Sequence, residues 1–430
     1  MKFELLHPAD QIVMLMQRIY DCGMTTTSGG NLSIKDSNGD IWITPGGIDK
    51  GSLARTDIIC VKENGEIIGP HRPSVELPFH QQIYKIRPEA GAVVHAHPPA
   101  LVAFSIAGSI PNTAVIPNAH LVCGKIDIAE YEVPGSIELG EKIAQKFESG
   151  NDVVMMENHG LVTLGNDLFQ AFMRFETLDF CARLEIGARR LGEVNSLTQE
   201  QLSIARTKQH VQMDEFIVKI HSSREKKVRQ DMCDIIHRAY NQRLFTSTQG
   251  TFSYKLSDDS FLITPYGVDR YYIEPGDIVR IDGDMHEAGK IPSRSVLLHR
   301  DIYEKNTNIN AVAIAHPPNI MSYGLSRQVF DSRVIPESYI MLRDIPSLPF
   351  GINITDPQKV CGILSESVPI VMIENDCLII TGDSLMQVFD RLEVAEFSAK
   401  ALLDALIVGT FKPISEDRVL DLKVAFNLKD

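Results

Sequence analysis

The sequence predicts an α/β protein built from two tandem copies of one domain, and three observations support this prediction. Short apolar, β-branched runs alternate with longer segments that carry apolar residues at helical spacing. The same succession of segments returns in the second half of the chain, at an offset of about 217–220 residues. The chain has 430 residues, more than one hydrophobic core usually serves. We therefore expect two domains, residues 1–210 and 211–430.

The first half begins with an amphipathic pattern. Residues 9–24 repeat isoleucine, leucine and methionine at helical spacing, which predicts a helix. A glycine-rich loop at residues 27–33 leads into a strand, and residues 41–47 combine a strand with a tight turn. Residues 58–68 hold two apolar runs separated by an Asn-Gly pair, which is typical of a hairpin. Short strands and helices are thus mixed from the start, as in an α/β domain.

The second half repeats this order. Residues 225–240 repeat the opening helix, and the polar stretches 207–212 and 222–227 mark the boundary region. The repeat spans a whole domain, so it differs from the short units of a solenoid. The corresponding segments are 27–33 with 248–253, 41–47 with 261–267, 72–80 with 291–299, 95–99 with 314–318, 156–160 with 373–377, and 172–177 with 388–393.

A candidate metal site begins in the stretch 91–99. Residues 92–96 are apolar and β-branched, so they predict a buried strand that the following two prolines end. Successive side chains of a strand point to opposite faces, so His95 and His97 share one face. Two neutral imidazoles at the end of a strand form half of a typical zinc site.

Two further residues extend this site. His159 follows the apolar run 153–156 and supplies a third imidazole, and three imidazoles with an open position are typical of catalytic zinc. Glu76 lies near the start of a predicted helix, where it serves as a metal ligand or a general base. Taken alone, His159 fits a hydrogen-bonded core histidine, and Glu76 fits a first-turn acid favoured by the helix dipole. His80, four residues after Glu76, is interpreted as structural because no HExxH motif is present.

Composition excludes several functions. The net charge of −14 disfavours a nucleic-acid partner, and no apolar run approaches the roughly 20 residues that span a bilayer. The N-terminus lacks the apolar core of a signal peptide. Seven cysteines stand singly, with no CxxC spacing, which favours buried thiols in a reducing compartment. We therefore expect a cytoplasmic protein without membrane or nucleic-acid partners.

Five segments of the first half occur in the order SGGNLS (28–33), ITPGG (43–47), RPSVELPFH (72–80), VVHAHPP (93–99) and ENHGLVTLG (157–165). Together these segments resemble the class II aldolase/adducin family, in particular L-fuculose-phosphate aldolase-like proteins, in which they come in the same order. The resemblance implies an α/β/α fold in each half, with a mainly antiparallel central sheet flanked by helices. It also implies a divalent metal, zinc or alternatively manganese or another ion, held by His95, His97 and His159.

The activity that the resemblance implies is that of a metal-dependent aldolase. Such a lyase cleaves a carbon–carbon bond in a ketose phosphate or a related sugar-derived keto compound through an enediolate, with Glu76 moving a proton. The alternatives are a sugar-acid-phosphate decarboxylase, dehydratase or 4-epimerase on the same fold, or a non-catalytic adducin-like scaffold. The family's phosphate-binding residues match at Gly30, Asn31, Gly47 and Ser74.

Two departures from the family pattern affect the substrate. Gly46 stands where the family has a threonine, and Val75 stands where it has a second serine. Both hydroxyl donors are therefore missing. A phosphorylated substrate held mostly by backbone groups and an unphosphorylated keto compound both remain open.

The second half has lost most of the predicted chemistry. Ser295, Ile314 and Asp376 replace Glu76, His95 and His159, and His316 alone survives, opposite His97. One imidazole and one carboxylate make a poor zinc site, so we expect a degenerate domain without the metal.

A role for the degenerate domain is suggested by the family's fourfold rings, whose active sites lie between protomers. A homodimer of this chain could form a pseudo-tetrameric ring around a small sugar-derived substrate. Tyr339 aligns near the family's aromatic acid and is a candidate acid in trans, although an interface or core role fits it equally.

Overall fold

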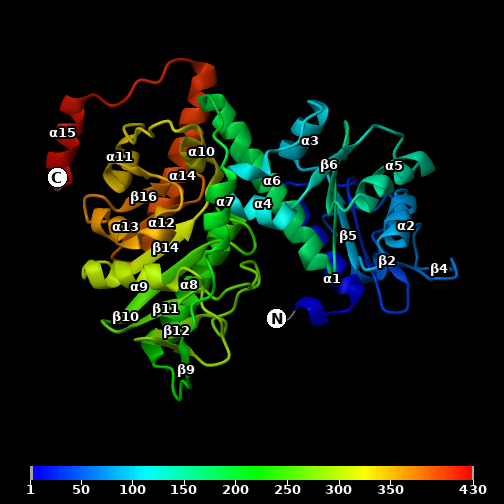
Figure 1. Ribbon diagram of the computed structural model, residues 1–430, viewed down its shortest axis with the longest axis horizontal. Coiled ribbons are helices and arrows are strands. Elements are labelled where there is room, and N and C mark those ends of the chain that lie inside the picture. The colour runs from blue at the N-terminus through cyan, green and yellow to red at the C-terminus, as the bar shows by residue number, and fades with distance from the viewer. Residues whose placement is uncertain (1–2, 429–430) are drawn as a thin grey trace. The chain divides into compact units, whose positions relative to one another are not determined.

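The computed structural model describes residues 3–428, and these divide into two compact units (Figure 1). The first unit contains the chain up to Thr113 together with Asn118–Ala182. The second contains Ala114–Pro117 together with the chain from Arg183 onward. These are packing units, so the domain limits 1–210 and 211–430 stay a prediction.

A mixed sheet forms the centre of the first unit, in the order β4-β3-β2-β1-β5-β8-β7-β6. Every neighbouring pair is antiparallel except β6 and β7. The predicted histidine strand is β5, and it lies between β1 and β8 with all five residues buried. The strands are β1 (Asn31–Lys35), β2 (Ile41–Ile43), β3 (Ile59–Val61), β4 (Ile67–Ile68), β5 (Ala92–Ala96), β6 (Ile126–Ala129), β7 (Val153–Met156) and β8 (Leu161–Gly165).

Helices cover both faces of this sheet (Figure 1). One face packs against α2 and α5, whose Phe79, Ile83 and Phe147 join Val93 and Val162 in one apolar cluster. The other face is covered by α1 and the first half of α6. The helices are α1 (Pro8–Asp21), α2 (Leu77–Ile86), α3 (Pro99–Ile106), α4 (Pro117–Cys123), α5 (Ile137–Glu148) and α6 (Leu168–Leu191), with 3₁₀ turns at Phe3–Leu5, Arg55–Asp57 and Thr113–Val115.

The second unit repeats this sheet and adds one strand. Its order is β15-β16-β17-β14-β10-β11-β12-β13-β9, in which β9 pairs parallel to β13 at the edge. The register also repeats, because Asn31 lies opposite His95 in the first unit and Thr251 lies opposite Ile314 here. The strands are β9 (Asp214–Phe216), β10 (Thr251–Ser257), β11 (Ser260–Ile263), β12 (Val279–Asp282), β13 (Met285–Glu287), β14 (Ala311–Ala315), β15 (Ser347–Leu348), β16 (Ile370–Ile373) and β17 (Cys377–Gly382).

The helices of the second unit follow the same sequence signals. Ser222 caps α8, since its hydroxyl accepts the backbone N–H of Glu225 at 3.1 Å. The two sheets and the helices around them confirm the predicted α/β fold with a mainly antiparallel sheet in both units. The helices are α7 (Gln199–Arg206), α8 (Ser223–Asn241), α9 (Val296–Lys305), α10 (Pro318–Ser326), α11 (Pro336–Leu342), α12 (Ile352–Thr355), α13 (Pro357–Ile363), α14 (Leu385–Val408) and α15 (Glu416–Ala425).

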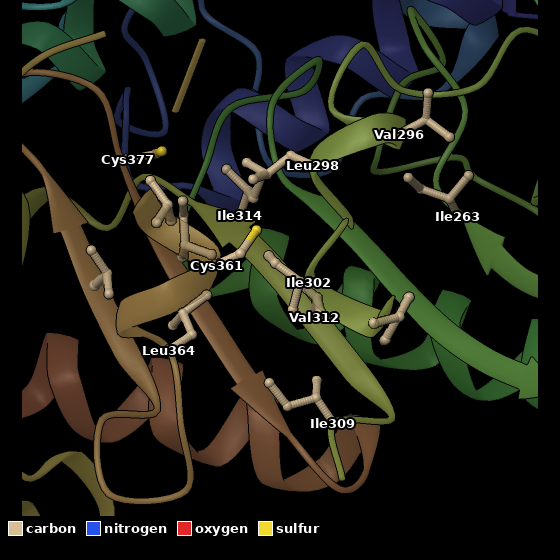
Figure 2. Packing of buried hydrophobic residues seen from close by; sticks show 14 of the residues in the cluster. Ile263, Val296, Leu298, Ile302, Ile309, Val312, Ile314, Cys361, Leu364 and Cys377 are labelled. Carbon is tan, nitrogen blue, oxygen red and sulfur yellow. The ribbon is translucent and has the colours of Figure 1, made fainter. Parts of the chain in front are cut away.

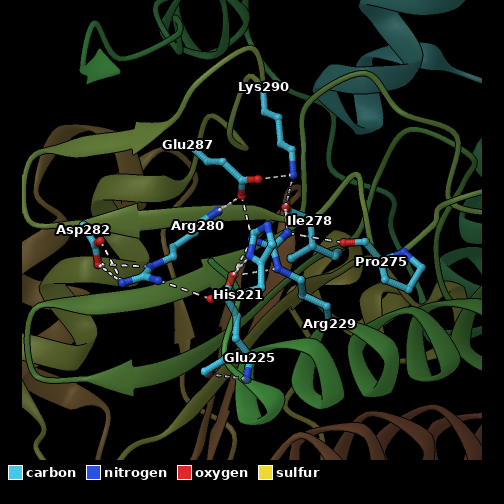
Figure 3. Close-up of polar contacts among 10 residues, drawn as sticks. His221, Glu225, Arg229, Pro275, Ile278, Arg280, Asp282, Glu287 and Lys290 are labelled. Atoms are coloured by element: carbon cyan, nitrogen blue, oxygen red, sulfur yellow. Dashed lines mark hydrogen bonds and ion pairs between the residues drawn. The ribbon is translucent and has the colours of Figure 1, made fainter. Parts of the chain in front are cut away.

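The interior of the second unit contains an apolar cluster and a buried ion network. Figure 2 shows an apolar cluster on the face of β14, in which Ile314 and Cys377 pack among other buried aliphatic side chains. Figure 3 shows a buried ion network in which Arg229 contacts both Glu225 and Glu287. Within residues 3–428, no helix combines the length and apolarity needed to cross a membrane.

Candidate metal centre

Local backbone geometry places the three predicted histidines. His95 and His97 lie at the C-terminal end of β5, on the face predicted from the strand period. His159 lies in the turn between β7 and β8, where the preceding Asn158 takes a φ of 52°. Because β8 pairs with β5, this turn lies at the same end of the two strands as the His95–His97 pair.

The three imidazoles meet in space. One nitrogen of each lies within 4.8 Å of the others, and their ring centroids are 4.7–5.1 Å apart. His95 donates its Nδ1–H to the carbonyl of Leu161 at 2.9 Å, so Nε2 is the ring nitrogen that faces the cluster. His97 Nε2 is buried and has no hydrogen-bond partner among the described residues. Three converging nitrogens of this kind fit a divalent metal.

Glu76 faces this cluster. Its Oε2 lies 3.2 Å from His95 Nε2, and its Oε1 lies 3.5 Å from His159 Nε2. Glu76 occupies the N-cap position of α2, and its backbone N–H donates to the hydroxyl of Ser74 at 3.3 Å. The side chain is therefore held at the helix start but turned toward the histidines. A carboxylate there can ligate a metal or move a proton.

The electrostatics suit a cation. Burial, together with His95, lowers the pKa of His97 to about 3 and that of His159 to about 4, so both rings are neutral, as metal ligands must be. Burial also lowers the pKa of His95, but the adjacent carboxylate outweighs it and raises that pKa. Burial alone would raise the pKa of Glu76, yet the neighbouring imidazoles and the amide of Asn31 hold it well below its usual range.

The predicted substrate-binding residues border the same site. Asn31 Nδ2 donates to Glu76 Oε2 at 2.6 Å, so this amide contacts the carboxylate directly. Gly30 has a φ of 73°, and a Cβ at that position would lie 2.8 Å from the carbonyl oxygen of His95. Gly47 also has a left-handed φ, of 70°. Ser74 is buried and serves as acceptor for Glu76. Their role toward a substrate stays a prediction.

Lys50 was missed by the sequence reasoning. It is 2% exposed, its ammonium donates to the carbonyl of Pro45, and its backbone N–H donates to Thr27 at 2.9 Å. It thus ties the two glycine-bearing loops together, and burial lowers its pKa to about 8. The signal was available, because Arg270 occupies the corresponding position and donates to the carbonyl of Pro265 at 3.0 Å.

Tyr339 lies in the second unit, on α11. The guanidinium of Arg343 lies 5.8 Å from its ring centroid, and the side chain lines a cavity of about 790 Å³ between α11 and α15. Its role as an acid stays a prediction.

The counterpart of the metal centre in the second unit has an isoleucine and an aspartate where the first unit has two of its three histidines. Ile314, which stands in place of His95, is 4% exposed inside the cluster of Figure 2. Asp376, in place of His159, accepts from Asn353 Nδ2 at 2.8 Å. Among the described residues, His95, His97 and His159 form the one group of three or more side chains that could hold a metal ion, and all three belong to the first unit.

Comparison with known proteins bears on the family of the chain. The family model described as "Class II Aldolase and Adducin N-terminal domain" matches residues 10–186 and again 230–403. The chain is 37% identical over 174 residues to an "L-fuculose phosphate aldolase" of Methanococcus maripaludis, covering 40% of this chain and 93% of that protein. It is 32% identical over 177 residues to a "3-oxo-tetronate 4-phosphate decarboxylase" of Haemophilus influenzae, covering 40% and 84%. A solved "L-fuculose 1-phosphate aldolase" is 28% identical, with coverage of 47% and 95% and a TM-score of 0.42. Because the two matched regions span most of the sequence, the chain belongs to the class II aldolase and adducin family.

Proposed function

We propose that this protein is a metal-dependent aldolase that cleaves a carbon–carbon bond in a ketose phosphate or a related sugar-derived keto compound. The observation that carries the proposal is the convergence of His95, His97 and His159 on one point, with the Glu76 carboxylate 3.2 and 3.5 Å from two of the rings. The duplicate has lost three of these four groups. If the first unit had no function either, there would be no reason for it to keep all four together.

The three histidines would hold a divalent ion, zinc or alternatively manganese. Such an ion acts as a Lewis acid that polarises a ketone oxygen and stabilises the negative charge that develops there. His95 is suited to this role because its Nδ1–H bond to Leu161 fixes the tautomer and the ring orientation.

Glu76 is the proposed acid/base. It is 6% exposed and its neighbours hold it ionised, so the proton-accepting form of the carboxylate is present beside the three imidazoles. Asn31 fixes the carboxylate by the 2.6 Å bond to Oε2. Ser74 and the positive-φ glycines 30 and 47 are proposed to present N–H and hydroxyl groups to the anionic end of the substrate.

The assembly is also part of the proposal. A homodimer forming a pseudo-tetrameric ring would allow Tyr339 of one chain to act as the acid at the site of another. Replacing Tyr339 with phenylalanine is expected to lower turnover while bound metal stays unchanged. Unchanged turnover would remove Tyr339 from the mechanism.

A decarboxylase is the second candidate. It is favoured by the relative named "3-oxo-tetronate 4-phosphate decarboxylase", and the same site would stabilise the same kind of charge after loss of carbon dioxide. A non-catalytic adducin-like scaffold is the remaining alternative.

Product analysis tests these candidates. The purified chain is incubated with zinc or manganese and with L-fuculose 1-phosphate or 3-oxo-tetronate 4-phosphate. Release of an aldehyde supports the aldolase, whereas release of carbon dioxide from the second compound supports the decarboxylase. The matched control is His97→Ala, which removes one metal ligand. Absence of both bound metal and zinc affinity in the unaltered protein would favour the scaffold.

A further inference from the structure

A line of buried polar groups leads away from Glu76 into the first unit. Asn31 bonds to Glu76 through Nδ2 and to His80 Nε2 through Oδ1. His80 Nδ1 then lies 2.7 Å from the hydroxyl of Ser33, which in turn lies 2.7 Å from the hydroxyl of Tyr84. Ser33 and His80 are fully buried, and Tyr84 is 5% exposed. The line therefore joins the candidate acid/base to the interior through buried side chains.

The Glu76 carboxylate at the outer end of this line determines which group donates and which accepts in the hydrogen bonds from Glu76 to Ser33. An ionised carboxylate only accepts, so Asn31 must present its NH₂ group to Glu76 and its carbonyl oxygen to His80. His80 must then donate from Nε2 and accept at Nδ1 from Ser33. Burial lowers the pKa of His80 to about 3, which keeps the ring neutral, as this tautomer requires.

The second unit contains the same three inner residues but not the outer two. Ser253 Oγ lies 2.6 Å from both His299 Nδ1 and the hydroxyl of Tyr303. His299 Nε2 is buried with no hydrogen-bond partner in the described chain, because Thr251 stands in place of Asn31 and pairs instead with Ser293 at 2.9 Å. The Ser–His–Tyr triad thus belongs to the fold, whereas its connection to a carboxylate is specific to the first unit.

We propose that His80 is a positioning residue that acts through Asn31 to hold Glu76 in its reactive orientation. The proposal rests on the acid/base role of Glu76 in the proposed function. An Asn amide can flip by 180° at little intrinsic cost, and the flipped form would direct its carbonyl oxygen at the Glu76 carboxylate. The donor at His80 Nε2 removes this alternative, and Ser33 fixes the tautomer that provides that donor.

Paired substitutions at His80 and His299 separate positioning from folding. His80→Phe and His299→Phe remove the same buried triad from the two units, so a structural role predicts similar losses of thermal stability and of turnover. The positioning role predicts that kcat falls about 10–100-fold for His80→Phe alone. His80→Gln, which keeps an N–H donor, is expected to recover part of the loss. Equal effects on kcat in the two phenylalanine variants would overturn the proposal.

Ser33→Ala and Ser253→Ala provide a second pair for the case in which His80→Phe does not fold. Side-chain ¹⁵N spectra report the tautomer of His80 directly and do not depend on turnover. We expect the Nε2–H form in the unaltered protein and a mixture in Ser33→Ala, with His80 unchanged in Ser253→Ala. An Nδ1–H form in the unaltered protein would overturn the proposal.

The two readouts distinguish failure of the proposal from failure of the proposed function. If the unaltered protein turns over neither probe substrate, the aldolase assignment fails, and the ¹⁵N spectra then decide whether His80 orients Asn31.

Discussion

Replacing Arg229 with alanine is expected to destabilise the second unit by about 3 kcal/mol at neutral pH. Its guanidinium donates to Glu225 Oε1 at 2.7 and 2.9 Å and to Glu287 Oε2 at 2.6 Å (Figure 3). All three residues are at most 8% exposed, so the substitution leaves two buried carboxylates with fewer partners. Breaking a buried ion pair by removing one member typically costs about 3–5 kcal/mol.

The lower end of this range applies because other cations remain. Arg280 Nη1 lies 3.2 Å from Glu225 Oε2, and Lys290 Nζ lies 2.6 Å from Glu287 Oε1. Both of these cations are partly exposed, so solvent screens them and they compensate incompletely.

The same network predicts a pH dependence with a definite sign. Burial alone would raise the pKa values of Glu225 and Glu287, but their basic partners outweigh it and lower both. A lowered pKa contributes stability above the ordinary glutamate pKa, and this stability is lost as the pH falls through the folded-state value. The difference in stability between the unaltered protein and Arg229→Ala is therefore expected to narrow below about pH 4.

Urea unfolding at about pH 7 and about pH 3 tests the prediction. Far-UV circular dichroism follows both units, while fluorescence of Trp42, the single tryptophan, reports on the first unit. Arg224→Ala, at an exposed position of the same helix, is the control and is expected to change stability by less than about 0.5 kcal/mol. An Arg229→Ala effect no larger than that of the control would refute the reasoning.

Three further predictions concern the first unit. His97→Ala is expected to abolish stoichiometric zinc binding, as measured by elemental analysis after dialysis, because it removes one of three converging nitrogens. Glu76→Gln is expected to lower kcat about 10²–10⁴-fold with thermal stability largely kept, and turnover within tenfold of the unaltered protein would contradict its acid/base role. Ser136→Ala is expected to cost about 1 kcal/mol in urea unfolding, because the hydroxyl accepts the N–H of Leu139 at 3.1 Å at the start of α5.

Strand periodicity accounts for what the sequence could predict about the site. An i, i+2 spacing places His95 and His97 on one face whatever the rest of the fold does. The position of His159 depends on the pairing of β8 with β5, which brings together residues more than 60 positions apart. Periodicity within one strand carries no information on such pairing. The family resemblance, not periodicity, placed His159 beside His95 and His97.

Local sequence patterns also failed to predict features that depend on contacts between distant segments. The boundary region contains β9 between its two polar stretches. This strand is three residues long and pairs in parallel with β13, although it has no apolar pattern of its own. Lys50 was not predicted to be buried, because a lysine is ordinarily exposed and only comparison with Arg270 in the duplicate indicates otherwise. His80 was interpreted as structural, which describes its triad but not its bond to Asn31.

The two units also differ in the residue that follows the third metal-ligand position, which is Gly160 in the first unit and Cys377 in the second. A Cβ at Gly160 would lie 2.7 Å from Cδ2 of His97 and 2.7 Å from the carbonyl oxygen of Ala96. In the second unit the corresponding residue is Cys377, which carries a Cβ where Gly160 has none. Supplying imidazoles alone is therefore not expected to rebuild the site.

This argument predicts the outcome of a reconstruction, made in a His97→Ala background so that the first unit does not bind zinc. Ile314→His with Asp376→His restores three imidazoles together with His316, and adding Cys377→Gly restores the space. We expect the triple variant to bind zinc at least about tenfold more tightly than the double variant, measured by competition with a chromophoric chelator. Thermal unfolding confirms that each variant is folded, because Ile314 lies in the apolar core. Equal zinc affinity of the double and triple variants would show that the glycine is not required and that ligand identity alone separates the two units.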